Sequence, residues 1–415
     1  MTTFAAGPPR VVGLRTGALP AWLDADASDT AQGLEGLCFD EAEYEARLDR
    51  VRRRMESAGL DALMVFRPSS IEYLCGFHTA ETAPQPLLVT ESETHLYVPD
   101  LEVGRALASS RADTILYCGY SDALTGLEQF VDHAARTVEP GSRVGVEMGH
   151  ISTPPHAVQV WSRHDVELVD SDHLVEHVRL VLSPAEIHCL ERAARVTDAG
   201  VRAAVVAAGE ARATDTSVAG AVAAALCEGA DSMSAWGPLV VTGRRAGIPH
   251  STWDGSALAP GPTFVEFSGT HHRYHAPVMR TLVRGSPEAT DTRLVELART
   301  AVQAVLENAR PGVLASDVAA GAADALGSLP RDVMFHHLFG YPVGLAHKPH
   351  WMDGAPFYIA DSNHQPLQEG MAFHIPAAFR AFGAQGVGLS QTFVVERGGS
   401  RVITHGPADL LRVEE

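Results

Sequence analysis

The chain has 415 residues, of which 46% are hydrophobic and 20% are charged, and its net charge at pH 7 is -19. This length exceeds what one hydrophobic core usually supports and predicts two domains, while the composition is that of a globular protein. The strong negative charge excludes proteins that bind nucleic acid or an anionic membrane through clustered lysine and arginine. The 20 histidines supply many side chains that exchange protons near neutral pH, but their number does not identify which of them act.

The cysteines and the first residues indicate the cellular environment. Five cysteines are scattered without a Cys-x-x-Cys pair, which predicts reduced and mostly buried thiols: Cys38, Cys75, Cys118, Cys189 and Cys227. Residues 1–17 lack the apolar core of a signal peptide, and no apolar run reaches membrane-spanning length. We therefore expect a soluble cytoplasmic protein with no nucleic-acid or membrane partner.

The N-terminal part of the chain predicts an extension followed by an α/β domain. Residues 1–36 are rich in Gly, Pro, Ala and Asp without a steady period, and we expect them to lie on the surface or on a dimer partner. Residues 37–178 are expected to form a domain in which helices and strands alternate. Its first helix starts near Phe39 with an acidic first turn and ends at Gly59. Buried strands are expected at residues 62–66, 86–89, 95–98 and 145–148.

Residues 179–415 are predicted to form a second domain of the α+β class. Ser183, Pro184 and Glu186 make a helix-start pattern, with a capping side chain, a proline at the first helical position and a carboxylate near the N-terminal dipole. A long amphipathic helix follows. Further helices are expected at residues 215–228 and 291–309, with a pair of strands between them.

The stretch between these two helices, residues 248–281, concentrates the polar side chains. A short strand of β-branched and aromatic residues is predicted around Glu266. A carboxylate in such a strand either points to solvent, the more common case for a lone Glu, or is held in a site whose neighbours set its pKa. The second alternative gains weight because Tyr274, His275 and Arg280 on the next strand can face the same way across a hairpin.

Landmarks along most of the chain resemble, in order, those of the pita-bread fold family, which includes the methionine and proline aminopeptidases, prolidase and creatinase. They are the run RLVLSPAEIHCLERAARVTDAG, the Arg280-Thr281 step, FGYPVGLAHKP, EGMAFHIP and GVGLSQTFVV. The resemblance spans residues 39–410 and implies a creatinase-like α/β N-terminal domain followed by an α+β pita-bread catalytic domain. It also implies a homodimer.

The peptidases of this family bind two metal ions through two Asp, one His and two Glu, because hard divalent ions prefer carboxylate oxygens. Carried over position by position, these ligands fall on Glu266, Pro277, Tyr341, a position near Pro376, and Ser390. Only one of these five positions offers a metal-binding side chain. His347 and His350 lie close to the lost His, but they lack acidic partners. We therefore expect no metal and no other cofactor.

Some members of the family work without metal. Creatinase has a His at the position of His250 for proton transfer, but it has a Glu where this chain has Met279, so its guanidinium-binding pattern is broken here. The strings PHSTWDG, VEFSGTHHRYHAP, GYPVGLAHKPHWMDG and FHIP are similar to blocks of the metal-independent ectoine hydrolases. Those blocks include the substitutions that remove the metal, and shared departures from a parent motif are more specific than shared generic motifs. In that resemblance Glu266 corresponds to the carboxylate that engages the cyclic amidine carbon.

The resemblance implies hydrolysis of a non-peptide C–N bond in a small cyclic amidine or related compound. Glu266 would act as nucleophile or base and His250 as acid and base. Arg280 would hold a substrate carboxylate, and Trp253 and Trp351 would wall the pocket against a flat cation. Further substrate contacts are expected from Tyr274, His275, Tyr341, His347 and His374.

Several of these residues also fit plain structural roles. Arg280 fits a buttress of the sheet, the two tryptophans fit core or rim positions, and His271 and His272 fit a solvated turn. Two other functions also remain open, namely a metal-dependent Xaa-Pro peptidase and a pseudoenzyme, binding protein or diverged biosynthetic enzyme on the same fold. The peptidase requires the missing carboxylates. His250, Glu266 and Tyr274 favour an enzyme over a pseudoenzyme.

Overall fold

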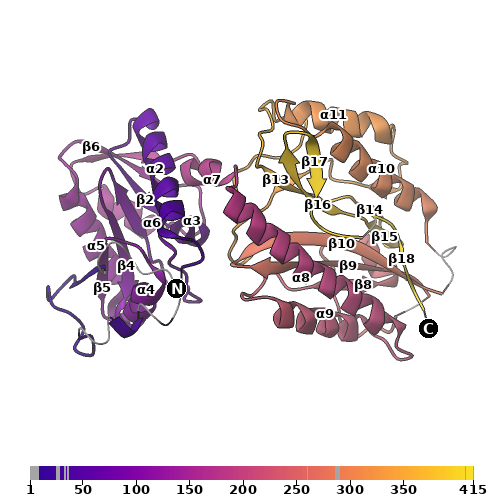
Figure 1. The fold of residues 1–415 in the computed structure, drawn as a ribbon, viewed down its shortest axis with the longest axis horizontal. Coiled ribbons are helices and arrows are strands. Elements are labelled where there is room, and N and C mark those ends of the chain that lie inside the picture. Colours follow the sequence, from indigo (N-terminus) through magenta and orange to yellow (C-terminus); the bar gives the residue numbers. More distant parts are fainter. Residues whose placement is uncertain are drawn as a thin grey trace. The chain divides into compact units, whose positions relative to one another are not determined.

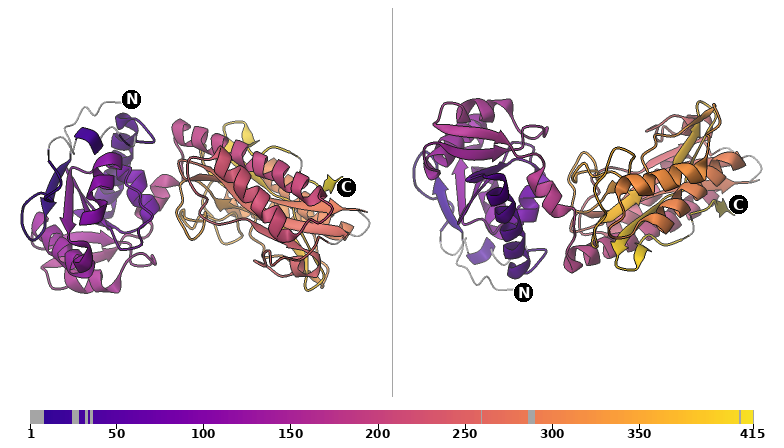
Figure 2. Two further views of the ribbon diagram at one scale, coloured as in Figure 1. Left: turned by 90° about the horizontal axis from the view of Figure 1, so that it is seen from below. Right: turned by 90° about the horizontal axis from the view of Figure 1, so that it is seen from above.

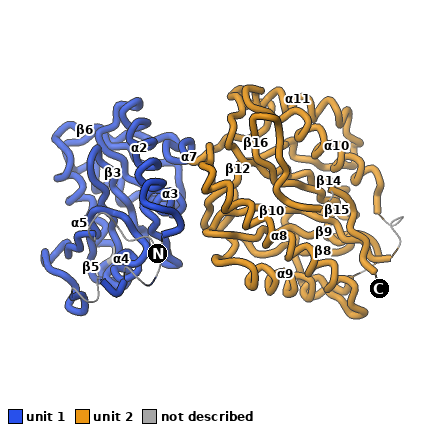
Figure 3. The backbone as a smooth tube through the Cα atoms, viewed as in Figure 1, with its two compact units in different colours: residues 1–178 blue, residues 179–415 orange. Residues whose placement is uncertain are grey.

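The computed structural model describes residues 9–24, 29–31, 34, 37–258, 260–285, 290–406 and 408–414 (Figure 1). The chain divides into two compact units, residues 1–178 and residues 179–415 (Figure 3). Across the described residues, no helix combines the length and the apolar character needed to cross a membrane.

Unit 1 is built on a seven-stranded sheet with the strand order β1-β5-β4-β3-β2-β6-β7. Neighbouring strands are parallel except that β3 runs antiparallel to both β2 and β4. The strands are β1 Arg10–Gly13, β2 Ala62–Val65, β3 Leu87–Thr90, β4 Thr94–Pro99, β5 Thr114–Cys118, β6 Ser142–Val146 and β7 Val166–Asp170. The helices are α2 Glu41–Ala58, α3 Pro68–Cys75, α4 Val103–Ser109, α5 Ala123–Thr137, α6 Pro155–Trp161 and α7 Leu174–Arg179, with short 3-10 turns at Asp100–Glu102 and Tyr120–Asp122.

Helix α2 confirms the sequence signals for its start and its end. The Asp40 side chain accepts a hydrogen bond from the Glu43 backbone N–H, and Gly59 ends α2 with a left-handed φ of 64°. The prediction for residues 1–36 was wrong for Arg10–Gly13, which pairs in parallel with β5 as an edge strand of the sheet. A short segment with two adjacent valines forms that strand because an existing edge supplies its backbone partners.

The described residues of unit 2 form three sheets, ordered β18-β10-β9-β8, β11-β14-β15 and β12-β13-β16-β17. The strands are β8 Leu239–Thr242, β9 Gly261–His271, β10 Tyr274–Arg284, β11 Val333–Met334, β12 Tyr341–Pro342, β13 Ala372–Ile375, β14 Ala378–Ala381, β15 Gln385–Gly388, β16 Gln391–Glu396, β17 Gly399–Val402 and β18 Leu411–Val413. The helices are α8 Pro184–Gly209, α9 Asp215–Gly229, α10 Thr292–Asn308 and α11 Ala315–Leu326, with a 3-10 turn at Gly243–Gly247. Figure 2 shows α8 and α9 on one side of this unit and α10 and α11 on the other.

Helix α8 begins as predicted and packs closely on the β9-β10 hairpin. Ser183 and Glu186 form a reciprocal capping box at its start. Further along, the Thr197 hydroxyl accepts a hydrogen bond from the Gly269 N–H and donates to the Ala276 carbonyl. A Cβ at Gly269 would lie 2.5 Å from the backbone N of Thr197, so only glycine permits this approach.

The alternation of side chains along β9 decides which residues reach the far side of the sheet. Val265 and Phe267 join the core under α8 and α9. Phe264 lies on the opposite face, in a small apolar cluster with Met279 and Ala378. Because side chains two apart share a face, Glu266 points to the same side as Phe264.

Candidate active site

Glu266 sits in the middle of the longest hairpin, directly opposite Met279 on β10 and Leu239 on β8. Its side chain is buried, with 5% of the residue exposed, so the solvent-facing alternative is wrong. Burial raises the pKa of its carboxyl to about 7, and the positive charge of Arg380 opposes part of that rise. Among the described residues, none donates a hydrogen bond to this carboxylate. Strand periodicity allowed either a solvent-facing or a buried Glu266. The packing of β14 and β15 over the side of β9 that carries Glu266 buries it.

A series of hydrogen bonds runs beside Glu266, formed by the β12-β13-β16-β17 sheet and its flanking loops. The Trp351 Nε1–H donates to the Tyr341 hydroxyl at 2.9 Å, and the Tyr341 oxygen lies 2.7 Å from His374 Nδ1. The other ring nitrogen of His374 lies 2.7 Å from the Ser390 hydroxyl, which accepts from the Met279 N–H at 2.6 Å. The series of hydrogen bonds therefore ends at Met279, the residue that pairs with Glu266 across the hairpin.

Burial sets the charge states of His374 and Tyr341 in this series of hydrogen bonds. Burial, with a smaller effect of Arg280, lowers the pKa of His374 to about 3, so the ring is neutral. Burial and then the nearby Glu266 raise the pKa of Tyr341 well above its ordinary value, so the hydroxyl keeps its proton. If His374 carries its proton on Nδ1 and donates to Tyr341, the Tyr341 proton is free to hydrogen-bond a group bound next to Glu266.

His250 and two further aromatic side chains surround Trp236, a residue that the sequence reasoning missed. The Trp236 ring centroid lies 5.8 Å from that of His250, 4.4 Å from that of His350 and 5.4 Å from that of Trp351. His250 is exposed and has a left-handed φ of 59°, which non-glycine residues adopt uncommonly. Its position on a loop ahead of β9 leaves its ring accessible while Trp236 supports one side.

Arg380 on β14 was also missed by the sequence reasoning, because FHIPAAFRAF contains no motif that marks it. Only 8% of the residue is exposed, and its Cζ atom lies 5.0 Å above the Phe264 ring on the face that carries Glu266. Arg380 interacts electrostatically with Glu266, and His336 is within electrostatic range of both Arg380 and His250. His336 therefore feels the charges of both Arg380 and His250, and Arg380 that of Glu266.

The structure separates Tyr274 and Arg280 from Glu266, so the expectation that they share its face across the hairpin was wrong. Glu266 pairs with Met279, and alternation along β10 turns the even-numbered Tyr274 and Arg280 toward the other face. The Tyr274 hydroxyl donates to Glu186 at 2.8 Å. The Arg280 guanidinium donates to main-chain carbonyls of Met279, Ser390 and His405. These contacts fit the buttress role for Arg280.

His275 shares the face of Glu266, but both of its ring nitrogens are already used. Nδ1 lies 2.8 Å from the Arg273 carbonyl, and Nε2 accepts from the Ala235 N–H at 2.9 Å. Burial lowers its pKa to about 3, so the ring is a neutral link between two loops. The alternation of side chains along the strand predicts the face on which His275 lies. It does not predict the main-chain groups that bind its ring nitrogens.

The remaining predicted substrate contacts lie at different depths. Trp351 is 1% exposed and supports Trp236 and Tyr341 from within the core. Trp253 is 47% exposed on the loop ahead of β9, and it therefore fits a rim position. His347 is half-buried, and its electrostatic effect adds to burial in lowering the pKa of His275, whereas the hydrogen bond to the Arg273 carbonyl opposes that lowering.

The residues at the positions implied for a dinuclear metal centre do not fit one. Glu266 is a carboxylate, but Pro277 and Pro376 offer no side-chain ligand, and Tyr341 and Ser390 are committed to His374. Two hard divalent ions need several carboxylates close together. These side chains therefore cannot hold a dinuclear metal centre.

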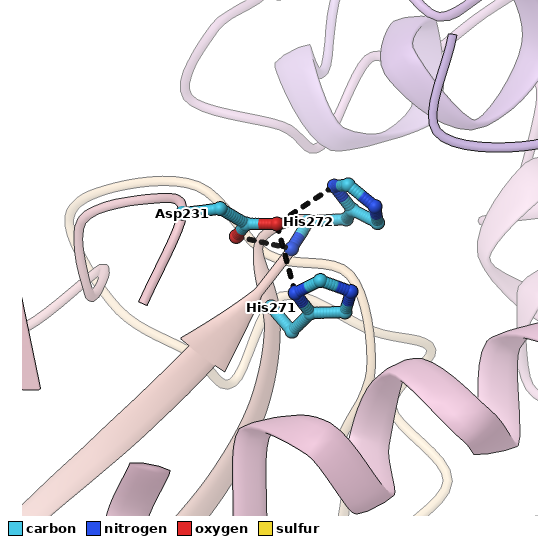
Figure 4. A group of neighbouring side chains, drawn as sticks. All are labelled: Asp231, His271 and His272. Carbon is cyan, nitrogen blue, oxygen red and sulfur yellow. Dashed lines mark hydrogen bonds and ion pairs between the residues drawn. The ribbon is translucent and has the colours of Figure 1, made fainter. Parts of the chain in front are cut away.

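One other cluster within the described ranges has the spacing of metal ligands: Asp231, His271 and His272. It lies at the tip of the β9-β10 hairpin, away from Glu266 at the middle of that strand. The Asp231 Oδ2 atom lies 2.8 Å from His271 Nδ1 and 3.0 Å from His272 Nδ1, as Figure 4 shows. The carboxylate holds both rings, so these two histidines are not simply solvated turn residues.

The fold defines a pita-bread protein with a creatinase-like N-terminal domain. The chain belongs to metallopeptidase family M24, whose sequence pattern matches residues 188–397, and a Creatinase/Prolidase N-terminal domain matches residues 47–181. This confirms the predicted family and the predicted fold class.

Relatives with different named activities lie at similar distances from this chain. The ectoine hydrolase of Halomonas elongata is 28% identical over 359 residues, which cover 81% of this chain and 89% of that protein. The Xaa-Pro dipeptidase of Pyrococcus horikoshii is 22% identical over 372 residues, which cover 88% and 98%. The solved structure of the dipeptidase PepE from Mycobacterium ulcerans has a TM-score of 0.76 at 25% identity and covers 92% of this chain and 100% of that chain. Hydrolysis is common to all three named activities.

Proposed function

We propose that this protein hydrolyses a C–N bond in a small cyclic amidine or related compound, with the carboxylate of Glu266 in place of a metal-bound water. The observation that carries this proposal is a buried carboxylate with no hydrogen-bond donor among the described residues, at a centre that lacks the other acidic metal ligands. A binding protein has little use for an ionisable group kept in such an unfavourable environment.

The reaction needs a cation for Glu266 and a proton for the leaving nitrogen. The carbon of a protonated amidine is electrophilic because its two nitrogens share the positive charge. The Glu266 carboxylate pairs with this cation and either attacks the carbon or takes a proton from a water that attacks it. The C–N bond then breaks, and the departing nitrogen takes a proton from His250. If Glu266 attacks the carbon, a water then adds to that carbon and the Glu266–carbon bond breaks, which regenerates the carboxylate. In both routes water supplies the oxygen and the protons of the ring-opened product.

The surroundings of Glu266 support these roles. Arg380 and a bound amidinium both favour the ionised carboxylate, whose pKa of about 7 would otherwise leave it partly protonated at neutral pH. Trp236 offers an aromatic face beside His250, where a flat cation can pack. The Tyr341 hydroxyl is suited to hydrogen-bond the departing or attacking group.

Ring opening of ectoine and 5-hydroxyectoine by the purified protein, followed by mass spectrometry with and without EDTA, tests the proposal. We expect ring-opened product at the same rate in both conditions. A parallel assay uses Xaa-Pro dipeptides with added Mn²⁺. Dipeptide cleavage that EDTA abolishes, with no ring opening, would replace this proposal with the peptidase.

A further inference from the structure

Arg380 is a buried cation in the site that no described residue neutralises directly. It lies on β14 between β11 and β15, with 8% of the residue exposed. Its Nε atom is fully buried and lacks a hydrogen-bond partner. Within the described part of the chain, no carboxylate forms an ion pair with it and no carbonyl accepts from it.

Arg280 shows what a purely structural arginine looks like in the same unit. It is also buried, but its guanidinium donates to the carbonyls of Met279, Ser390 and His405. Arg280 thus has the acceptors that a buried guanidinium needs, whereas Arg380 lies over the Phe264 ring and finds no acceptor among the residues that the structure describes. A buried charge without a partner is costly, and a ligand that supplies the partner removes that cost.

The two unpaired charges have opposite signs and share one face of the sheet. Phe264 carries the Arg380 guanidinium above its ring, and Glu266 is the next side chain along that face of β9. Arg380 and Glu266 influence each other electrostatically but form no direct ion pair. A molecule bound between them therefore meets a cation at one end and an anion at the other.

We propose that Arg380 binds a carboxylate of the substrate, and that the substrate is a zwitterion whose cationic amidine lies against Glu266. The second half of this statement rests on the proposed function. The guanidinium fork matches a carboxylate in a bidentate geometry, which a lysine cannot reproduce. Such a substrate neutralises both buried charges at once, so recognition and the ionisation of Glu266 are coupled.

The competing explanation is that Arg380 only keeps Glu266 ionised. The two explanations differ for a pair of compounds, ectoine and its carboxamide, which share the amidine ring and differ in the carboxylate. If Arg380 binds the carboxylate, its loss penalises the acid alone. If it acts only through Glu266, its loss penalises both compounds equally.

The test measures kcat/KM and, by calorimetry, binding of ectoine and ectoine carboxamide to the full-length parent protein, Arg380→Met and Arg380→Lys. We expect the parent to prefer the acid by about 100-fold, and Arg380→Met to lose about 100-fold toward the acid while the carboxamide changes less than about threefold. Arg380→Lys should retain an intermediate preference because it keeps the charge without the fork. Arg244→Met, at an exposed position, is the control and should keep the full preference.

Several outcomes would overturn the inference. They are equal binding of acid and carboxamide by the parent, no binding of either, or an equal loss for both compounds in Arg380→Met. The comparison within the parent needs no variant, so it stands even if Arg380→Met fails to fold. Carboxylate-dependent binding without ring opening would leave the role of Arg380 intact and reject the proposed function. Ring opening with no preference for the acid would support the proposed function and reject the role of Arg380.

Discussion

Glu266 is a carboxyl group whose charge is set by what lies next to it. Burial raises its pKa from the ordinary value of 4.5 to about 7, and Arg380 limits that rise. A cationic substrate stabilises the ionised form further, so binding should release the proton that the empty site holds near neutral pH. The ionised carboxylate, which is the form that can act as base or nucleophile, should then predominate in the substrate complex.

Replacing Glu266 with Gln keeps the shape of this side chain and removes its charge. We expect kcat for ring opening to fall by about 10² to 10⁴-fold. In the parent, kcat/KM should rise with pH through about 7, because the ionised carboxylate is the active form. Steady-state kinetics between pH 5 and 9 measures both effects, with the exposed Glu210→Gln as a matched control. Full activity in Glu266→Gln would reject the catalytic role.

His250 is exposed on the loop ahead of β9, and its expected role is proton transfer. His250→Ala should lower kcat by about 10² to 10⁴-fold while KM changes only a few-fold, because the missing proton is needed in the transition state. The exposed His188→Ala serves as the control. A rise in KM with unchanged kcat would assign His250 to binding instead.

The β9-β10 hairpin is the element that carries the site, and α8 fixes its position. The contact depends on Gly269, where a Cβ would lie 2.5 Å from the Thr197 N and 2.6 Å from the Ala193 carbonyl oxygen. These are backbone atoms of a helix, so they cannot move aside as a flexible side chain would. The position of Glu266 therefore depends on Gly269, which lies on the opposite face of the hairpin.

Gly269→Ala should destabilise unit 2 by at least about 1–3 kcal/mol, because α8 must shift away from the strands. Thermal unfolding followed by circular dichroism measures this change. Gly237→Ala is the matched control, since a Cβ there meets no atom within 4 Å and should leave the melting temperature nearly unchanged. Equal melting temperatures for the two variants would contradict this account.

Register explains which parts of the hairpin could be predicted. The sequence predicted two strands and placed Glu266 within the first, and β9 and β10 confirm this. It could not assign Tyr274 and Arg280 to a face, because that depends on which residue pairs with which across the turn. The observed pairing of Glu266 with Met279 sends both side chains to the α8 side.

At the scale of the whole molecule, each unit forms its own core, and all the site residues named above lie in unit 2. A buried carboxyl in such a core affects the stability of the unit as a function of pH. The folded pKa of Glu266 is above its ordinary value, so the stabilising neutral form is complete below about pH 4.5 and is lost as the pH rises through about 7. The difference between the two pKa values corresponds to about 3 kcal/mol.

Glu266→Gln should therefore melt at a higher temperature than the parent at pH 8, and at the same temperature near pH 4.5. Calorimetric scans at the two pH values measure this difference. Glu210→Gln should match the parent at both pH values. A gain that is equal at both pH values would show that the carboxyl charge is not its cause.

The sequence by itself determined the family, the two kinds of domain and the start of α8. These features depend on local patterns, such as capping residues, hydrophobic periods and the identity of single positions. Such patterns can be recognised in one sequence without knowledge of the tertiary structure. Only the tertiary structure showed that Glu266 is buried and that Arg280 donates to main-chain carbonyls. It also showed that Arg380 lies over Phe264 and that Trp236 lies beside His250. Those properties depend on strand register and on which distant segments cover a face, because burial and pairing arise between residues that the sequence keeps far apart.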